Sequence, residues 1–302
     1  MRFSLKQLEY FIAVSETKNI SIAAKQINIS SPSLSSAISH LENEFSIKLF
    51  LRKHASGLHL TKAGEQFADA AKTIINQSKD LYNIANELTN NKVGNINLGC
   101  LSTLAPIIAP SLRSKYKEKN NTVSITQIEG NQANLIDRLI NGKIDIALTY
   151  DLSLPKTISF IPLVKVPPHI LLHAEHELSV LKEIELKDLQ DEPFILLDLP
   201  LSREYFLSIF DNLKIKPKIS EKSSQISVVR SLVAHKFGYS IANLQLGIPQ
   251  SIDGLKIAQI PIKGKHKNLT LGYAIMDQEF MATIVKDFLD FSTNYFKLHK
   301  KN

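Results

Sequence analysis

The feature that most constrains the fold is a regular alternation of strand-like and helix-like segments that begins near Val93. In the first half of this region the expected strands and helices are, in order, residues 96–101, 102–120, 123–130, 134–143 and 144–150. Such a repeat is typical of a mostly parallel sheet with helices on its faces. The alternation recurs after about residue 165, and residues 269–296 most simply rejoin the first part. We therefore expect an α/β domain of two lobes, joined by crossing strands, with a cleft between them.

The composition narrows the class of protein. The 302 residues allow two or three domains, and the only cysteine, Cys100, excludes a disulfide framework and a multi-thiolate zinc site. The chain starts without the apolar region of a secretory signal, and no apolar run approaches the ~18 residues of a membrane span. We expect a cytoplasmic protein that needs no cofactor, no metal and no membrane.

The net charge of +7 is compatible with binding to nucleic acid but does not locate it. Residues 1–92 carry a net charge of +3 and residues 93–302 a net charge of +4. Because the surplus is spread along the chain, basicity alone does not decide the function.

Three short helices are expected in the first 45 residues. Ser4 and Gln7 fit a capping box for the first helix. Ser21 is the expected N-cap of the second helix, which would bury Ile22, Ala24 and Ile27, and it is also a candidate DNA-binding residue. Ser31 is the expected cap of the third helix, with Pro32 at its first position, where the missing N–H is harmless.

The third helix has two unlike faces. Its apolar positions, which fall on one side, are Leu34, Ile38, Leu41 and Phe45. The opposite side carries Pro32, Ser35, Ser36, Ser39 and Asn43. Serine is an indifferent helix former, and its short hydroxyl lets a helix approach base edges and phosphates. A short helix, a turn and a second helix with such a face indicate a helix-turn-helix that binds DNA.

A hairpin is expected next, because residues 49–60 read as strand, turn and strand. Arg52, Lys53 and His54 lie near its tip, where cations can reach phosphates or a narrow minor groove. The alternative is a plain three-helix bundle with a solvated serine face and a surface hairpin, and periodicity leaves that alternative open.

A long helix is expected from Thr61, its N-cap, to about Asn90. Its 3-4 apolar spacing comprises Phe67, Ala70, Ile74, Gln77, Leu81, Ile84 and Leu88. Gln77 is the one polar member and could fix the register against a partner helix. Because little of its own chain lies beside this segment, we expect a dimerisation helix rather than a surface helix packed on its own domain.

The first 66 residues resemble the winged helix-turn-helix of LysR-type transcriptional regulators. The matching stretches are LKQLEYFIAVSETKNISIAAKQINISSPSLSSAISHLENEFSIKLFLR and LTKAGE, in the family's order and without gaps. Further on, GNINLG, NGKIDIAL and LVAHKFGYSIAN are similar to landmarks of the family's periplasmic-binding-protein-like effector domain. Such regulators often carry Gln where this chain has Ser31 and Arg where it has Ser36, so specificity is expected to lean on the wing and on DNA shape.

The resemblance implies a domain plan and a set of partners. It assigns residues 1–60 to the DNA-binding domain, 61–92 to the dimerisation helix, and 93–302 to the effector domain. The first lobe would span about 93–165 and 269–302, and the second about 166–268. Each dimer would bind a pseudo-palindromic operator in double-stranded DNA, with half-sites ~34–36 Å apart. In the family, a small effector changes how a dimer of dimers, a homotetramer, bends DNA and contacts RNA polymerase.

Ligands of open α/β sheets bind beyond the carboxyl ends of the strands, where helices begin. The residues that we expect to bind the effector are Ser102, Thr103, Asn131, Asp198, Ser202, Arg203 and Gln225. Backbone N–H groups and hydroxyls at helix starts favour an anion, and Arg203 is a candidate partner for its carboxylate or phosphate. Asp198 could pair with an amine group if the effector carries one. Simple N-capping by the serines and a solvent-facing Arg203 are the alternatives.

Other functions have weaker support. His173 and His176 form an HxxH without further ligand-type residues, so a solvated loop is favoured over a metal site. Cys100 could sense oxidants, but a buried structural thiol is the commoner case. A solute-binding receptor of the same two-lobed fold would leave residues 1–92 unexplained. We find no GxxxxGK[ST], HExxH or GxSxG motif, and so we expect no enzyme and no catalytic residues.

Overall fold

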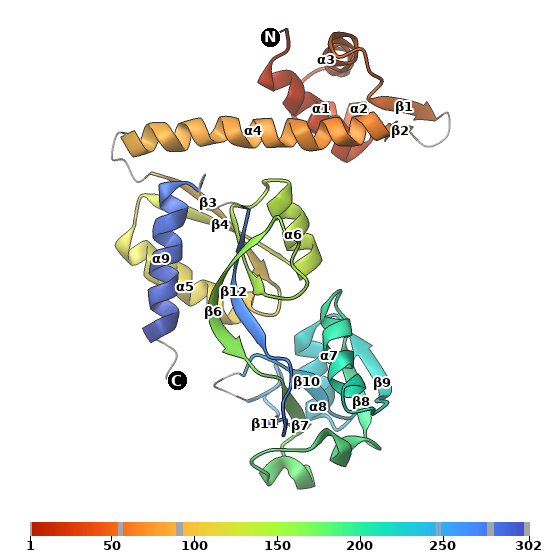
Figure 1. The fold of residues 1–302 in the computed structure, drawn as a ribbon, viewed down its shortest axis with the longest axis vertical. Helices are drawn as coiled ribbons and strands as arrows, with labels where there is room; N and C mark the ends of the chain where they lie inside the picture. The colour runs from red at the N-terminus through yellow and green to blue at the C-terminus, as the bar shows by residue number, and fades with distance from the viewer. Residues whose placement is uncertain are drawn as a thin grey trace. The chain divides into compact units, whose positions relative to one another are not determined.

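The computed structural model describes residues 2–53, 57–88, 93–245, 247, 249–276 and 281–298. The chain divides between Lys92 and Val93 into two compact units (Figure 1). Within the described ranges, no helix combines the length and the apolar character that crossing a bilayer requires.

The first unit is a helical domain with a two-stranded hairpin. Its elements are α1 Leu5–Thr17, α2 Ile20–Gln26, α3 Ser31–Glu44, β1 Phe50–Lys53, β2 Gly57–Leu60 and α4 Lys62–Leu88. One core, which includes Leu8, Phe11, Leu34, Leu41 and Leu49, joins the three short helices to the hairpin and to the start of α4. The expected helix-turn-helix and hairpin are therefore present.

The start of α1 agrees with the sequence prediction, because the capping box of Ser4 and Gln7 is confirmed. The starts of α2 and α3 differ from it. The N-cap of α2 is Asn19, whose side chain accepts from Ser21 N and Ile22 N at 2.9 and 3.1 Å, so Ser21 lies inside the helix. Ile22 is 50% exposed, contrary to the prediction, whereas Ala24 is buried as predicted, together with Ala23, and Ile27 is half-buried.

The third helix begins one residue earlier than expected. Ser30 is its N-cap and accepts from Ser33 N, so Ser31 is its first residue and Pro32 its second. Leu34, Ile38 and Leu41 are buried as predicted, but Phe45 lies just beyond the helix and is partly exposed.

The first lobe of the second unit is built on a five-stranded sheet of order β4-β3-β5-β12-β6. The strands are β3 Gly94–Leu101, β4 Val123–Gly130, β5 Ile146–Tyr150, β6 Ser159–Val166 and β12 Leu269–Ile275. The helices of this lobe are α5 Ala105–Lys119, α6 Gln132–Ile140 and α9 Thr283–Leu298. As expected, the last strand and helix return to this lobe.

The second lobe has a core of its own. Its strands are β7 His169–His173, β8 Pro193–Leu197, β9 Lys218–Ser223, β10 Ser240–Ala242 and β11 Ile257–Pro261, and its helices are α7 Ser202–Asp211 and α8 Ile226–Ala234. Two short 3-10 helices, η1 Glu177–Val180 and η2 Leu186–Leu189, complete it. Figure 1 shows β6 and β12 running side by side between the two lobes.

The sheets are mixed rather than mostly parallel. β3 is parallel to β4 and β5, and β8 is parallel to β9. However, β12 is antiparallel to β5 and β6, and β10, β7 and β11 form an antiparallel sheet. The difference arises because the chain leaves the first lobe along β6 and returns along β12, so these neighbours run in opposite directions.

Candidate functional sites

The outer face of α3 carries the side chains predicted to lie nearest DNA. Pro32, Ser36 and Ser39 are exposed, whereas Ser31 and Ser35 are half-buried. Because these side chains are short, the helix backbone can approach a groove closely along this face. The arrangement fits a recognition helix, and contact of each residue with DNA stays a prediction.

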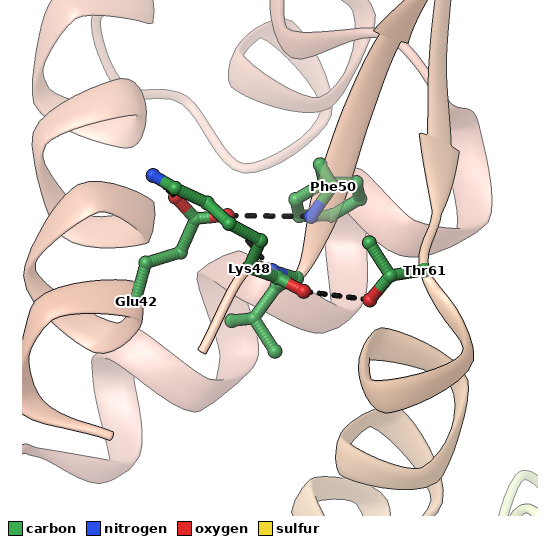
Figure 2. A network of polar contacts seen from close by, with 5 residues as sticks. Glu42, Lys48, Phe50 and Thr61 are labelled. Atoms are coloured by element: carbon green, nitrogen blue, oxygen red, sulfur yellow. Dashed lines mark hydrogen bonds and ion pairs between the residues drawn. The ribbon is translucent and has the colours of Figure 1, made fainter. Parts of the chain in front are cut away.

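The hairpin that follows α3 is an antiparallel pair with Phe50 opposite Leu60 and Arg52 opposite Leu58. His54 lies outside the described residues, as do the side-chain positions of Arg52 and Lys53. At its base, Glu42 of α3 and Thr61 before α4 both bond to the segment that enters β1 (Figure 2).

The long helix α4 has one face that is buried in the first unit and another that is exposed. Ala68, Ala71 and Ile75 are buried against the first unit, and the Thr61 hydroxyl caps the helix by accepting from Gly64 N at 2.8 Å. Phe67 belongs to this core, with its ring centroid 5.3 Å from that of Phe11, so the predicted seam does not include it.

Beyond Phe67 the predicted seam is exposed. Its described members are Ala70, Ile74, Gln77 and Leu81, and the Leu81 side chain is 65% exposed. The side chains of Ile84 and Leu88 lie outside the described residues. An apolar stripe that its own unit leaves uncovered is what a partner helix would bury.

A cavity of about 330 Å³ lies between the two lobes of the second unit. Its lining is mainly apolar and includes Leu101, Ile107, Leu197, Leu199, Phe206 and Leu244. Five of the seven predicted effector residues also line it, namely Ser102, Thr103, Asn131, Ser202 and Gln225. A pocket of this size and character suits a small molecule.

The cavity contains one buried cation that the sequence analysis did not single out. Arg230 of α8 is only 6% exposed and is the one charged side chain among the described residues of the lining. Its Nε and Nη2 donate to the Gln250 carbonyl oxygen at 3.2 and 2.8 Å, and no described carboxylate lies within ion-pair distance. Burial lowers the pKa of Arg230, but a guanidinium stays protonated. The site therefore holds a positive charge that no described carboxylate balances.

Helix starts around the cavity add further donors. α5, α7 and α8 each begin without a side-chain cap, whereas Asn131 caps α6 by accepting from Asn134 N. The hydroxyls of Ser102, Thr103 and Ser202 make no hydrogen bond to any described residue. None of these three residues is thus an N-cap, and their hydroxyls, like the helix-end N–H groups, are available to an anion.

Two families together match nearly the whole chain. Residues 5–65 match "Bacterial regulatory helix-turn-helix protein, lysR family", and residues 89–297 match "LysR substrate binding domain". The chain belongs to the LysR family of transcriptional regulators. The curated HTH-type transcriptional regulator BudR of Raoultella terrigena is 30% identical over 258 residues, which cover 82% of this chain and 85% of BudR.

Crystal structures of two LysR family regulators from Pseudomonas aeruginosa show the same fold. HinK is 29% identical, with a TM-score of 0.64, over 97% of this chain and 99% of its own. The PA01 protein is 30% identical, with a TM-score of 0.65, over 98% of this chain and 99% of its own.

Membership of the LysR family decides between the functions left open by the sequence. A receptor of the same two-lobed fold would not account for the match over residues 5–65. LysR-type proteins are DNA-binding regulators with an effector domain and are not enzymes.

Two predicted effector residues of this LysR-type regulator are placed elsewhere. Asp198 and Arg203 do not line the cavity; the carboxylate and the guanidinium bond to each other at the start of α7. This ion pair gives each charge a protein partner outside the cavity, and the charged side chain in the described lining is Arg230 instead.

The remaining candidates are the two histidines of the HxxH motif and Cys100. His176 is the N-cap of η1, since its Nδ1 accepts from Leu178 N at 3.1 Å, and its ring lies against His173. The described residues contain no cluster of three or more His, Cys, Asp or Glu side chains suited to a metal ion. Cys100 is fully buried in β3.

Proposed function

We propose that the effector of this LysR-type regulator is a small carboxylate-type anion with an apolar body, bound in the cavity between the lobes. The observation that carries the proposal is Arg230, a buried cation that no described carboxylate neutralises. A bound anion would supply the missing counter-charge, and charge-assisted hydrogen bonds in a buried site are the strong ones.

The rest of the lining fits the same ligand. The apolar side chains offer room for a hydrocarbon body, while the hydroxyls of Ser102, Thr103 and Ser202 and the uncapped helix starts offer donors to oxygen atoms. Burial raises the pKa of Tyr205 to about 12, so this lining phenol stays neutral and does not repel an anion.

The ligand would act by favouring one arrangement of the lobes over another. Transmission to DNA would proceed through dimers, paired along the exposed face of α4 and assembled into tetramers on a pseudo-palindromic operator. Contact with RNA polymerase would then change. Since the target is chromosomal DNA, the protein would act in the cytoplasm.

Thermal unfolding of the full chain with matched ligand pairs tests the proposal. Benzoate and phenylacetate carry a charge and an apolar body, benzamide and phenylacetamide lack the charge, and acetate lacks the body. At one hundred times its dissociation constant a ligand adds about 2.7 kcal/mol to the unfolding free energy, which raises Tm by roughly 5–10 °C. We expect this rise with an aromatic acid only; an equal rise with its amide would contradict the proposal.

A further inference from the structure

The segment that leads into the wing is held by a carboxylate of the recognition helix. Glu42 lies in the last turns of α3, and its side chain is 12% exposed. Its Oε1 accepts from Leu49 N at 2.8 Å and from Phe50 N at 3.3 Å, and its Oε2 accepts from Lys48 Nζ at 2.9 Å (Figure 2). A single side chain thus satisfies two backbone donors at the entry to β1.

The same segment is held from its other side by the start of α4. The Thr61 hydroxyl donates to the Lys48 carbonyl oxygen at 2.6 Å, and Thr61 N donates to the Leu49 carbonyl oxygen at 3.0 Å (Figure 2). Gly64 allows this approach, because a Cβ atom there would lie 2.1 Å from the Leu49 carbonyl oxygen. Residues 48–50 are therefore fixed between α3 and α4.

Side-chain packing fills only part of the space between α3 and the wing, although Leu49 is buried in the core of this unit and Phe50 packs against it. A hollow of about 350 Å³ lies there, lined on the helix side by Ser35, Ser39 and Glu42 and on the wing side by Lys48, Phe50 and Leu58. Across this hollow the Glu42 carboxylate makes the side-chain hydrogen bonds that join α3 to the described residues at the start of β1. The second strand of the wing is held separately, because Leu58 N donates to the Lys18 carbonyl oxygen at 3.2 Å. Burial raises the pKa of Glu42, but the bonds from Lys48, Leu49 and Phe50 outweigh it and lower the pKa, so the tie persists as a carboxylate at neutral pH.

We propose that Glu42 is a positioning residue for DNA binding: it sets the wing at a fixed distance from the recognition helix, so that both reach one DNA site together. This inference rests on the predicted contact of the wing with DNA. Glu42 would then strengthen DNA binding, although its side chain is negatively charged and lies on the recognition helix.

The direction in which DNA affinity changes when Glu42 is replaced distinguishes a positioning role from a simple electrostatic effect of its negative charge. Removing a negative charge near DNA should by itself strengthen binding and steepen its salt dependence. Loss of a positioning residue should do the opposite, because the wing cations would no longer meet the phosphates. Glu44 provides the matched control, since it is exposed, lies two residues away on α3, and has no part in the network.

The test measures the affinity of the full-length protein for a fluorescent duplex from upstream of its own gene and for a scrambled duplex, at several salt concentrations. We expect Glu42→Gln to weaken binding about threefold to tenfold, and Glu42→Ala more. The salt slope should be smaller by about one for each phosphate that the wing no longer neutralises. Glu44→Gln should leave both quantities unchanged or raise them.

Circular dichroism first establishes which Glu42 variants are folded; if Glu42→Ala is not, Glu42→Gln decides. Unchanged or tighter binding by a folded variant would overturn the proposal, as would weaker binding at an unchanged salt slope, because the wing would then still neutralise its phosphates. The double variant Arg52→Glu/Lys53→Glu separates the premise from the inference. If its slope equals that of the wild type, the wing does not contact DNA and the premise itself fails.

Discussion

Arg230 on α8 is held to Gln250, twenty residues further along the chain, by two hydrogen bonds to a single carbonyl oxygen, at 3.2 and 2.8 Å. The carbonyl orients the guanidinium but cannot neutralise it. The cavity therefore contains a fixed cation whose remaining donors can meet a ligand.

Substitution of Arg230 should uncouple the cavity from anions. A hydrogen bond to a charged group contributes about 1.5–3 kcal/mol, so Arg230→Met should weaken binding of an aromatic carboxylate by a factor of about 10 to 100. Arg230→Lys should recover part of the affinity, because it keeps the charge but loses the planar fork. Isothermal titration calorimetry measures both.

The control for Arg230 is Lys236→Met. Lys236 lies just after the same helix, pairs with Glu175 at the surface, and does not line the cavity. Equal losses of affinity in Arg230→Met and Lys236→Met would mean that net charge, not the cavity cation, governs ligand binding.

His169 should make the protein sensitive to mild acid. Its ring is buried, and neither nitrogen has a hydrogen bond of normal geometry to a described residue, although the Pro167 carbonyl lies close enough to favour the protonated form. Burial, with a smaller contribution from Arg230, lowers the pKa of His169 from 6.5 to about 4. Between these two values the unfolded chain binds a proton that the folded chain does not.

Stability should consequently fall as the pH drops from 6.5 towards 4, by about 2 kcal/mol from this histidine at pH 5. Urea unfolding of wild type and His169→Leu at pH 7 and pH 5 measures the difference between them. His40→Asn, which changes an exposed histidine, should behave as the wild type. An equal loss of stability in wild type and His169→Leu would show that His169 does not titrate on unfolding.

The exposed stripe of α4 should determine self-association. Ile74→Asp and Leu81→Asp place a charge where a partner helix would bury an apolar side chain, and we expect each to shift dimers towards monomers by tenfold or more. Analytical ultracentrifugation over a range of concentrations measures the shift. Asp69→Lys, on an exposed part of α4 away from the stripe, is the control; dimers as tight in both Asp variants as in the control would place the interface elsewhere.

Cys100 should be chemically inert in the folded protein. Burial, with a smaller contribution from the nearby Glu129 carboxylate, raises the pKa of the Cys100 thiol to about 12, so only on the order of one thiol in ten thousand is a thiolate at pH 8. Labelling with a thiol-reactive disulfide should proceed only as fast as the domain unfolds, and should be immediate in urea. Rapid labelling of the folded protein would revive an oxidant-sensing role.

Hydrophobic periodicity and N-cap preferences predicted most of the helices and strands. They placed a helix start wrongly where a second suitable N-cap residue lay one or two positions before the expected one. Ser21 and Ser31 are both acceptable N-caps, but Asn19 and Ser30 take that position. Preference for a cap residue type does not distinguish candidates one or two residues apart; the packing of Ala23, Ala24 and Leu34 decides.

Two edge strands, β6 and β11, were not predicted from the periodicity. Both β6 and β11 contain proline, at Pro162 and Pro261, which argues against a strand in the middle of a sheet. Each lies at the edge of its sheet, where a missing N–H is tolerated.

The charged residue of the cavity could not be predicted from the sequence, for a different reason. The sequence places Arg203 at a helix start and Arg230 in the apolar body of a helix, so the first is the better guess for an anion site. The pairing of Arg203 with Asp198 and the position of Arg230 in the cavity lining depend on tertiary packing, and no local sequence pattern predicts them.

The most direct test of the account measures DNA binding and its response to the anion together. Fluorescence anisotropy would compare the upstream duplex with the scrambled one, with and without the most stabilising acid, for wild type and Arg230→Met. We predict that both proteins bind the upstream duplex more tightly, and that the acid changes the affinity or the bending of DNA with wild type alone. An equal response of both proteins to the acid, or none in the wild type, would contradict the account.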